Sequence, residues 1–220
     1  MDMSLHSWCK KTLLFLVAML IGVAMMLTPA TAMAQLDFGA ALGAFLGAAQ
    51  PQQQDVVSPY DAIRENAPAK SKILGTWQYK SASLEYLGTP NPIADVALTQ
   101  VEGIGISALQ SRGVVEGCCS LTLRRNGMAI LATRDTLQDG VMTYDEESAK
   151  VEFSTTVEGV TYTAKGYIRI VSDRLVVLLD ARDAMNIVAK STPSITSDQM
   201  FLTAKEVLKT VGDVYLAIAF

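Results

Sequence analysis

Histidine is almost absent from this chain, and its scarcity narrows the chemistry that the protein can perform. The one histidine, His6, lies in a stretch that we expect to be removed after synthesis. Without it, a Ser-His-Asp or Cys-His catalytic site and a histidine-containing zinc site are excluded. The chain also lacks a Gly-x-Ser-x-Gly, a P-loop and a Gly-x-Gly-x-x-Gly motif. We therefore predict a protein that is not an enzyme, with no catalytic residue, metal site or cofactor; an enzyme remains the third candidate.

Cysteine is scarce as well, with three residues in the chain. Cys9 precedes the first apolar run, so it does not occupy a lipoprotein-like position. Cys118 and Cys119 are adjacent, and in a regular strand their side chains point to opposite faces, where they cannot bond without distorting the backbone. An ordinary buried Cys119 is the favoured interpretation. A strained vicinal disulfide and intermolecular pairing through Cys118 stay open.

Clustered positive charge is also missing, and the formal net charge is −4. Nucleic acid is therefore an improbable partner, because phosphate binding needs grouped Lys and Arg. Two groups of carboxylates, at 145–147 and at Asp180 with Asp183, lack the Asp-x-Asp-x-Asp-Gly spacing of a calcium loop. We expect them to be solvated turn residues.

Residues 1–34 have the features of a signal peptide. Lys10 and Lys11 precede an apolar run at 12–27, and Ala32-Met33-Ala34 offers small residues to a signal peptidase. The run is shorter than the roughly 20 residues that a spanning helix needs. We expect an exported protein, periplasmic, secreted or on the cell surface; a retained anchor is the alternative.

Residues 35–72 form a Gly/Ala-rich segment and a linker. Gly39, Gly43 and Gly47 recur every four residues, a spacing that lets helices approach closely in membranes. The segment 36–49 is therefore a candidate for peripheral contact with the cell envelope. A loosely structured lead-in is the favoured interpretation, since repeated Gly weakens an isolated helix. The sequence 50–59 reads as a linker, followed by a short helical turn around Tyr60–Glu65.

From Ile73 onward the chain alternates between apolar and polar residues, as strands with one buried face do. The first predicted strand, 73–87, places Trp77, Tyr79, Ser81 and Ser83 on one face. Hairpin turns are expected at Asn126-Gly127, Asp139-Gly140, Glu158-Gly159 and Ser172-Asp173. Helical spacing predicts one helix at 91–112 and two more, at about 182–190 and 197–211, before an apolar last strand at 213–220. These segments give eight strands, and pairing the last with the first removes both exposed edges of the sheet.

Gly75-Thr76-Trp77 resembles the Gly-x-Trp motif that opens the first strand of lipocalins and related calycin barrels. Residues 73–220 resemble exported bacterial lipocalin-like domains of unknown function in their order of strands and helices. The resemblance implies a mainly β fold: an eight-stranded antiparallel up-and-down barrel with a helix after strand 1 and two helices before the last strand. It also implies that Trp77 closes one end and that an Arg packs on it. The last strand has no Arg, and Arg169, Arg174 and Arg182 remain candidates.

An eight-stranded barrel is filled by side chains or holds one small ligand. By analogy, the favoured function is non-catalytic binding of a small apolar molecule, with the two late helices as a lid. The second hypothesis is a structural or envelope-interaction module with a filled barrel. An outer-membrane barrel is a rival, because alternating apolar residues end in a terminal Phe.

The candidate cavity-lining residues are Trp77, Tyr79, Leu121, Leu123, Phe153, Tyr162 and Ile168. Sequence leaves open the ligand, the oligomeric state and the redox state of the thiols.

Overall fold

A computed structural model of the chain describes residues 58–88, 114–133, 137–157, 159–191, 193–197 and 199–220, together with residues 98, 102 and 110. The predicted signal peptide and the Gly-striped segment 36–49 lie outside these residues. Within the described residues, no helix combines the length and the apolar character needed to cross a membrane.

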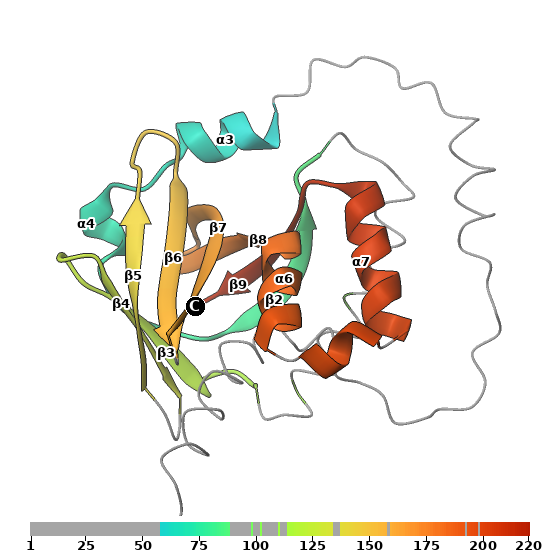
Figure 1. The fold of residues 1–220 in the computed structure, drawn as a ribbon. Coiled ribbons are helices and arrows are strands. Elements are labelled where there is room, and N and C mark those ends of the chain that lie inside the picture. Colours follow the sequence, from blue (N-terminus) through green and yellow to red (C-terminus); the bar gives the residue numbers. More distant parts are fainter. Residues whose placement is uncertain are drawn as a thin grey trace, which may run out of the picture.

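The described chain is built around one curled antiparallel sheet (Figure 1). Its strands follow the order β1-β3-β4-β5-β6-β7-β8-β9-β2, so each strand from β3 to β8 pairs with the next one along the chain. The mainly β fold with helices before the last strand is therefore confirmed, with nine strands in place of eight. The strands are β1 (Gly75–Gln78), β2 (Ser81–Tyr86), β3 (Cys119–Leu123), β4 (Met128–Thr133), β5 (Leu137–Tyr144), β6 (Lys150–Val157), β7 (Val160–Val171), β8 (Arg174–Asp180) and β9 (Val214–Ala219).

The ninth strand arises because the predicted first strand is two strands. β1 pairs with β3 and β2 pairs with β9, and only Tyr79 and Lys80 separate them. The Tyr79 amide donates to the Cys119 carbonyl and the Lys80 amide to the Ala219 carbonyl, both at 2.8 Å. The two ends of the strand order therefore meet at this pair of residues, as ring closure between the first and last segments requires.

This change of partner also reverses the side-chain pattern. Trp77 and Tyr79 pack with the inner core, but Ser81 and Ser83 are exposed, while Ala82 and Leu84 contact the core instead. The prediction that Ser81 and Ser83 share a face with Trp77 is thus wrong, because strand faces alternate strictly only while the strand stays regular. The predicted start at Ile73 is also wrong, since Ile73 ends a short helix and β1 begins at Gly75.

Most of the predicted hairpins are present. Gly127 has a φ of 80° between β3 and β4, and Ser172 and Asp173 have φ of 49° and 60° between β7 and β8. Asp139-Gly140 is the exception, because both residues lie inside β5 and the β4–β5 connection at 134–136 is outside the described residues. A side chain at Gly140 would place its Cβ 2.8 Å from the Ser154 carbonyl oxygen, so this Gly permits close strand approach and makes no turn.

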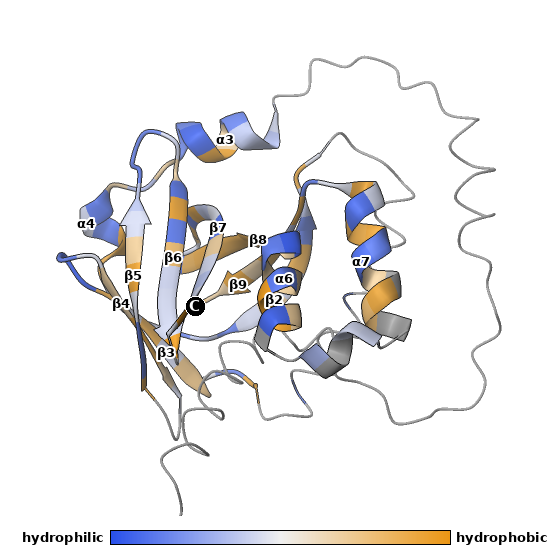
Figure 2. Cartoon of the chain, viewed as in Figure 1, coloured by the Kyte–Doolittle hydropathy of each residue, from blue (hydrophilic) through white to orange (hydrophobic). Residues whose placement is uncertain are grey.

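The two late helices pack against the interior of the sheet. They are α6 (Ala181–Ser191) and α7 (Gln199–Val211), joined by a 3₁₀ helix, Pro193–Ser197. Val188 of α6 is fully buried, and Phe201 of α7 is 2% exposed in the same core as the inward-facing strand residues. Both helices carry interspersed apolar and polar residues (Figure 2), and their buried apolar residues belong to this core. The helix predicted at 91–112 lies mostly outside the described residues; Leu98 within it is helical and buried.

A second, smaller core lies on the opposite face of β8 and β9. Helix α3 (Pro59–Glu65) buries Ile63 against Leu178 and Ala217 there. The Tyr60 hydroxyl donates to Asp213 at 2.7 Å, which ties α3 to the start of β9. Helix α4 (Lys70–Ile73) then leads into β1. The short helix predicted around 60–65 is confirmed as α3, and most of the predicted linker, 50–59, lies outside the described residues.

Candidate functional site

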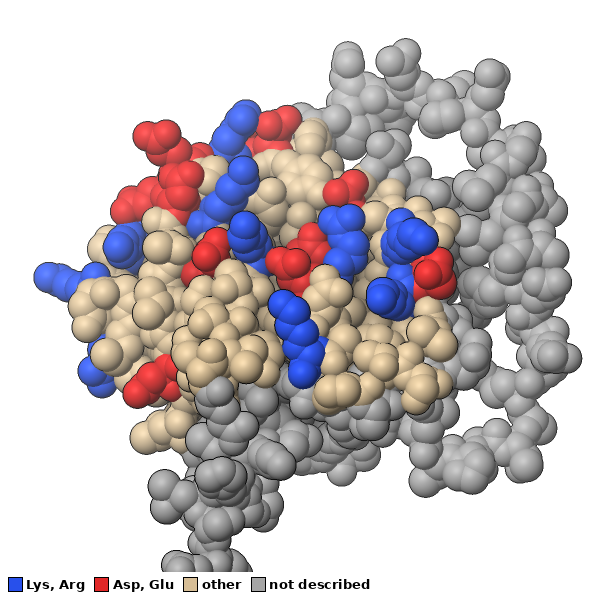
Figure 3. Space-filling view, in the orientation of Figure 1, with Lys and Arg blue, Asp and Glu red and all other residues tan. Residues whose placement is uncertain are grey.

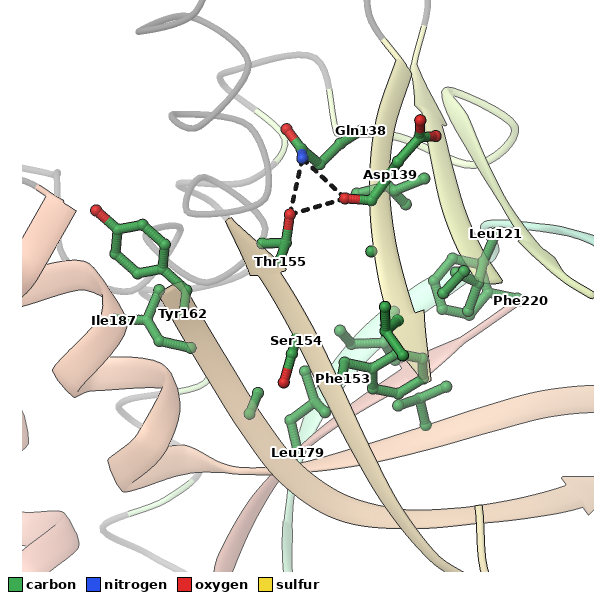
Figure 4. Close-up of a pocket in the computed structure, with 17 residues that line it drawn as sticks. Leu121, Gln138, Asp139, Phe153, Ser154, Thr155, Tyr162, Leu179, Ile187 and Phe220 are labelled. Carbon is green, nitrogen blue, oxygen red and sulfur yellow. Dashed lines mark hydrogen bonds between the residues drawn. The ribbon is translucent and has the colours of Figure 1, made fainter. Parts of the chain in front are cut away.

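The inner face of the sheet lines an apolar cavity of about 110 Å³ (Figure 4). Side chains from β3 to β9 line it, together with Ile187 of α6. Alternation places most of these residues on the inner face, since successive side chains of a strand point to opposite sides. An engineered cavity of about 150 Å³ lined by apolar side chains stays dry and binds benzene. A cavity of this size therefore suits a group of a few carbon atoms.

Three of the seven residues predicted to line a cavity do so: Leu121, Phe153 and Tyr162. Trp77, Tyr79, Leu123 and Ile168 belong to the same core but do not line the cavity. Leu123 is 2% exposed and Ile168 is fully buried, so both fill the interior at another level of the barrel. All seven predicted residues thus belong to one core, and only three of them border the cavity.

Several lining residues lie outside the predicted set. Ile218 lies in β9 and Phe220 directly follows it, Val177 and Leu179 lie in β8, and Ile187 lies in α6. The alternation of 214–220 places Ile218 and Phe220 on one face, so this signal was present in the sequence. No sequence signal distinguishes Ile187 from the other apolar residues of α6, because only helix packing decides which of them reaches the cavity.

The one polar edge of the cavity lies between β5 and β6. The Gln138 side-chain amide donates to Thr155 Oγ1 at 2.8 Å and to the Asp139 carbonyl at 3.0 Å. The Thr155 hydroxyl in turn donates to the same carbonyl at 2.8 Å. Figure 4 shows this triangle above the apolar side chains Phe153 and Leu179. Every other side of the cavity is almost purely apolar, so a ligand inside it can form hydrogen bonds only at this edge.

Trp77 packs at the edge of the inner core without lining the cavity. Its indole Nε1 donates to the Ile73 carbonyl at 2.8 Å, which fixes the ring against helix α4. Of the three Arg candidates for packing on Trp77, Arg169 pairs with Glu85 of β2 at 2.7 and 2.8 Å, and Arg182 pairs with Asp180. The guanidinium groups of Arg169 and Arg182 are therefore both paired with carboxylates on other elements.

The two adjacent cysteines are free thiols with their sulfur atoms 3.3 Å apart. The expectation of side chains on opposite faces is wrong here, because Cys118 lies in a bend before β3 and only Cys119 is within the strand. Burial raises the pKa of the Cys119 thiol far above its usual range, with the hydrogen bond from Cys118 adding to the effect. A thiol in this state is a poor nucleophile.

The carboxylates that were expected to be turn residues form hydrogen bonds with residues close to them in the sequence. Asp145 accepts bonds from the Glu147 amide at 3.0 Å and from the Ser148 hydroxyl, within the β5–β6 turn. Asp180 accepts the Arg182 amide at 2.8 Å at the start of α6. Within the described part of the chain, no group of three or more His, Cys, Asp or Glu residues is arranged to hold a metal ion. On the face seen in Figure 3, Lys and Arg alternate with Asp and Glu, and form no continuous basic surface.

Comparison with protein-family models matched residues 50–220 to a family described as Lipocalin-like domain (DUF4923). The match covers most of the chain and all of the described strands and helices. Comparisons with curated proteins and with solved structures found no match.

Proposed function

The chain belongs to the lipocalin-like domain family, and we propose that it is a non-catalytic binding protein for a small apolar molecule. The observation that carries this proposal is the cavity of about 110 Å³, whose lining is apolar except at the edge between β5 and β6. An empty apolar space of this kind is costly in a packed core, because its lining loses contacts. A bound apolar group restores those contacts. Fold membership alone is a weaker argument, because one fold supports many functions.

The size of the cavity limits the ligand that it accepts. A volume of about 110 Å³ is below the roughly 300 Å³ of ordinary small-molecule pockets. The group that binds inside is therefore a short aliphatic segment or a single ring. Four or five buried methylene groups contribute about 3–4 kcal/mol, so we expect dissociation constants near the millimolar range for a fragment alone.

A matched pair of substitutions on β4 tests the cavity. Ala129 lines it, whereas Ala132 faces outward on the same strand. We expect Ala129→Leu to fill the cavity and to lower benzene affinity about tenfold or more, and Ala132→Leu to leave it unchanged. The affinity is measured by NMR titration of methyl resonances. Benzene binding that survives Ala129→Leu would contradict the proposal. Native mass spectrometry of the mature protein, purified from its own cell envelope, then identifies the natural ligand.

Export is part of the same proposal. The charged start, the apolar run at 12–27 and the small residues at 32–34 support cleavage after Ala34 and a location in the periplasm, outside the cell or on its surface. Amino-terminal sequencing of the protein purified from its source tests this expectation. A first residue at Gln35 supports it, and an intact Met1 overturns it.

A structural or envelope-interaction module is the second candidate, and the small size of the cavity favours it. Most of the interior is filled by side chains, and Leu137 and Val141 are 72% and 60% exposed on the outside of β5. Deleting residues 35–57 tests this role, because the deletion leaves α3 in place. Loss of envelope association with the domain still folded supports the second candidate, and unchanged association contradicts it.

A further inference from the structure

Cys118 and Cys119 place two thiols in direct contact at the start of β3. Their sulfur atoms are 3.3 Å apart, and neither belongs to a disulfide. Cys118 lies in a bend directly after Gly117, whose φ of 75° is in the left-handed region that favours Gly. The bend takes Cys118 out of the alternation of β3 and brings the two sulfur atoms together. A separation of about 3–3.5 Å is typical of two atoms positioned to react.

The two thiols differ in their access to solvent. Cys118 is partly exposed, whereas Cys119 is 3% exposed and belongs to the inner core. Burial also raises the pKa of the Cys119 thiol, which keeps it protonated and unreactive toward reagents in solution. A reagent from solvent therefore reaches Cys118, and Cys119 reacts with a group that is already on its neighbour.

The dithiol lies at the junction where β1 ends and β2 begins. The Tyr79 amide donates to the Cys119 carbonyl at 2.8 Å, and the Gly117 amide donates to the Tyr79 carbonyl at 2.9 Å. The Lys80 Nζ donates to the Glu116 carboxylate at 2.7 Å. These three bonds hold the bend against the two residues that join β1 to β2. The peptide between the cysteines is therefore flanked by backbone bonds that the junction needs.

A disulfide between neighbouring residues is strained. Consecutive Cα atoms are about 3.8 Å apart across a trans peptide, below the roughly 4.4–6.8 Å that disulfides usually span. Such a bond forms only if the backbone between the two residues twists, and strained disulfides are reduced more easily than structural ones. Oxidation at this position is therefore reversible and changes the backbone at the junction.

We propose that Cys118 and Cys119 form a redox-sensitive site that exchanges with small-molecule disulfides, closes into a reversible disulfide and thereby loosens the junction of β1 and β2. The Cys118 thiolate attacks one sulfur of the small disulfide, whose S–S bond breaks and releases one thiolate. Cys119 loses its proton to solvent and attacks the Cys118 sulfur, which releases the second thiolate. Two electrons and two protons thus leave the pair, and the small disulfide becomes two thiols. Excess small thiol reverses both steps.

Intact mass after equilibration with oxidised glutathione tests the exchange. The full chain carries Cys9→Ser in every sample, so that only the pair can react. We expect the pair to lose two hydrogen atoms with no glutathione attached, and Cys119→Ala to retain one glutathione on Cys118. Cys118→Ser should react about tenfold or more slowly than Cys119→Ala, because its remaining thiol is buried. An unreacted pair, a lasting glutathione adduct on it or a disulfide-linked dimer overturns the proposal.

Hydrogen exchange tests the effect on the junction. We expect the amides of Tyr79 and Gly117 to exchange about tenfold faster in the oxidised protein, while those of β6 and β7 stay unchanged. Excess reduced glutathione should restore both the mass and the exchange rates. Cys118→Ser, treated in the same way, should show no acceleration. Unchanged exchange at the junction, acceleration throughout the sheet or a pair that stays oxidised in excess reduced glutathione contradicts the proposal. None of these readouts involves a cavity ligand, so their outcome is separate from that of the proposed function.

Discussion

Gly166, near the middle of the long strand β7, shows how a single residue lets two strands approach closely. A Cβ at this position would collide with the carbonyl oxygen of Leu178 on the neighbouring strand. Gly166 pairs with Val151 on one side and Leu179 on the other, so it lies where β7 passes from one partner to the next. A Gly inside a strand commonly marks such a close approach of two backbones.

Substituting Gly166 should therefore weaken the whole sheet. We expect Gly166→Ala to lower the free energy of unfolding by about 1–3 kcal/mol, because the added methyl group forces β7 away from β8. Lys165→Ala, one residue away and exposed, should change it by about 0.5 kcal/mol or less. Urea denaturation followed by the fluorescence of Trp77 measures both. Equal stabilities of the two variants would show that the strands adapt without cost.

Tyr144 makes the stability of the protein depend on pH in the alkaline range. Burial raises the pKa of Tyr144 to about 12, with the neighbouring carboxylates of Glu146 and Asp145 adding to the shift. Its hydroxyl donates to the Pro68 carbonyl at 2.7 Å. The folded protein holds this proton more tightly than the unfolded chain, whose pKa is about 10. The contribution of the protonated Tyr144 hydroxyl to the free energy of unfolding is therefore complete below pH 10 and is lost as the pH rises toward 12.

Replacing this hydroxyl should flatten the alkaline limb of the stability profile. We expect Tyr144→Phe to lose about 0.5–1.5 kcal/mol near neutral pH, from the missing hydrogen bond, and to decline less steeply than the wild type between pH 10 and 12. Urea midpoints at pH 8, 10 and 11.5 measure the difference. Tyr79, whose pKa burial also raises to about 12, still titrates in both proteins. Parallel profiles would mean that Tyr144 does not contribute.

Among the elements, α3 illustrates how a short helix depends on the sheet beneath it. Seven residues are too few for a stable isolated helix. Ile63 is 5% exposed and packs on the outer face of β8 and β9, where Leu178 is fully buried. The rings of Tyr60, Tyr167 and Tyr215 surround the contact, with centroids 5.7–6.3 Å apart. Tertiary packing, more than helix propensity, keeps α3 folded.

Removing the buried side chain of α3 should release the helix and leave the sheet folded. We expect Ile63→Ala to cost about 2–4 kcal/mol, the range for a large-to-small substitution in a core. Hydrogen exchange of the amides at 60–66 should accelerate while that of β6 and β7 stays slow. Glu65→Ala, on the exposed side of α3, is the control. Acceleration throughout the sheet would show instead that α3 and the sheet unfold as one unit.

At the scale of the whole molecule, β9 joins the meander of β3 to β8 to β2, the last strand in the order of the sheet. It pairs with β8 on one side and with β2 on the other. Phe220 exchanges two backbone bonds with Leu175, at 2.8 and 3.1 Å, and its side chain is 5% exposed beside the cavity. Without β9, both β8 and β2 lose a partner, and unpaired strand edges promote association between molecules.

Truncation tests this closure. We expect a chain that ends at Asp213 to aggregate or to elute as large oligomers in size-exclusion chromatography. Phe220→Leu keeps the strand and should remain folded, at a cost of about 1–2 kcal/mol. Far-UV circular dichroism distinguishes a folded product from an unfolded one. A folded monomer lacking 214–220 would show that the sheet does not need its last strand.

Local patterns predicted much of this fold from sequence. Alternation located the inner residues of β3, β6 and β7, and helical spacing located α6 and α7 closely. The predictions were wrong where a local pattern that is typical of a turn or of one continuous strand forms a different structure within the sheet. Asp139-Gly140 is typical of a turn, yet it lies within β5, because close approach to Ser154 also requires Gly. The break at Tyr79–Lys80 depends on two partner strands, β3 and β9, that are distant in sequence.

The candidate site shows the same limit. Leu121, Phe153 and Tyr162 were predicted to line a cavity because they are apolar and face inward, and they do so. Leu123 and Ile168 satisfy the same criteria and are packed solid. The order of apolar and polar residues determined which side chains face the interior, since a strand's two faces follow from its geometry. Where the interior stays empty was decided only by tertiary structure, because it depends on how strands and helices from across the chain fit together.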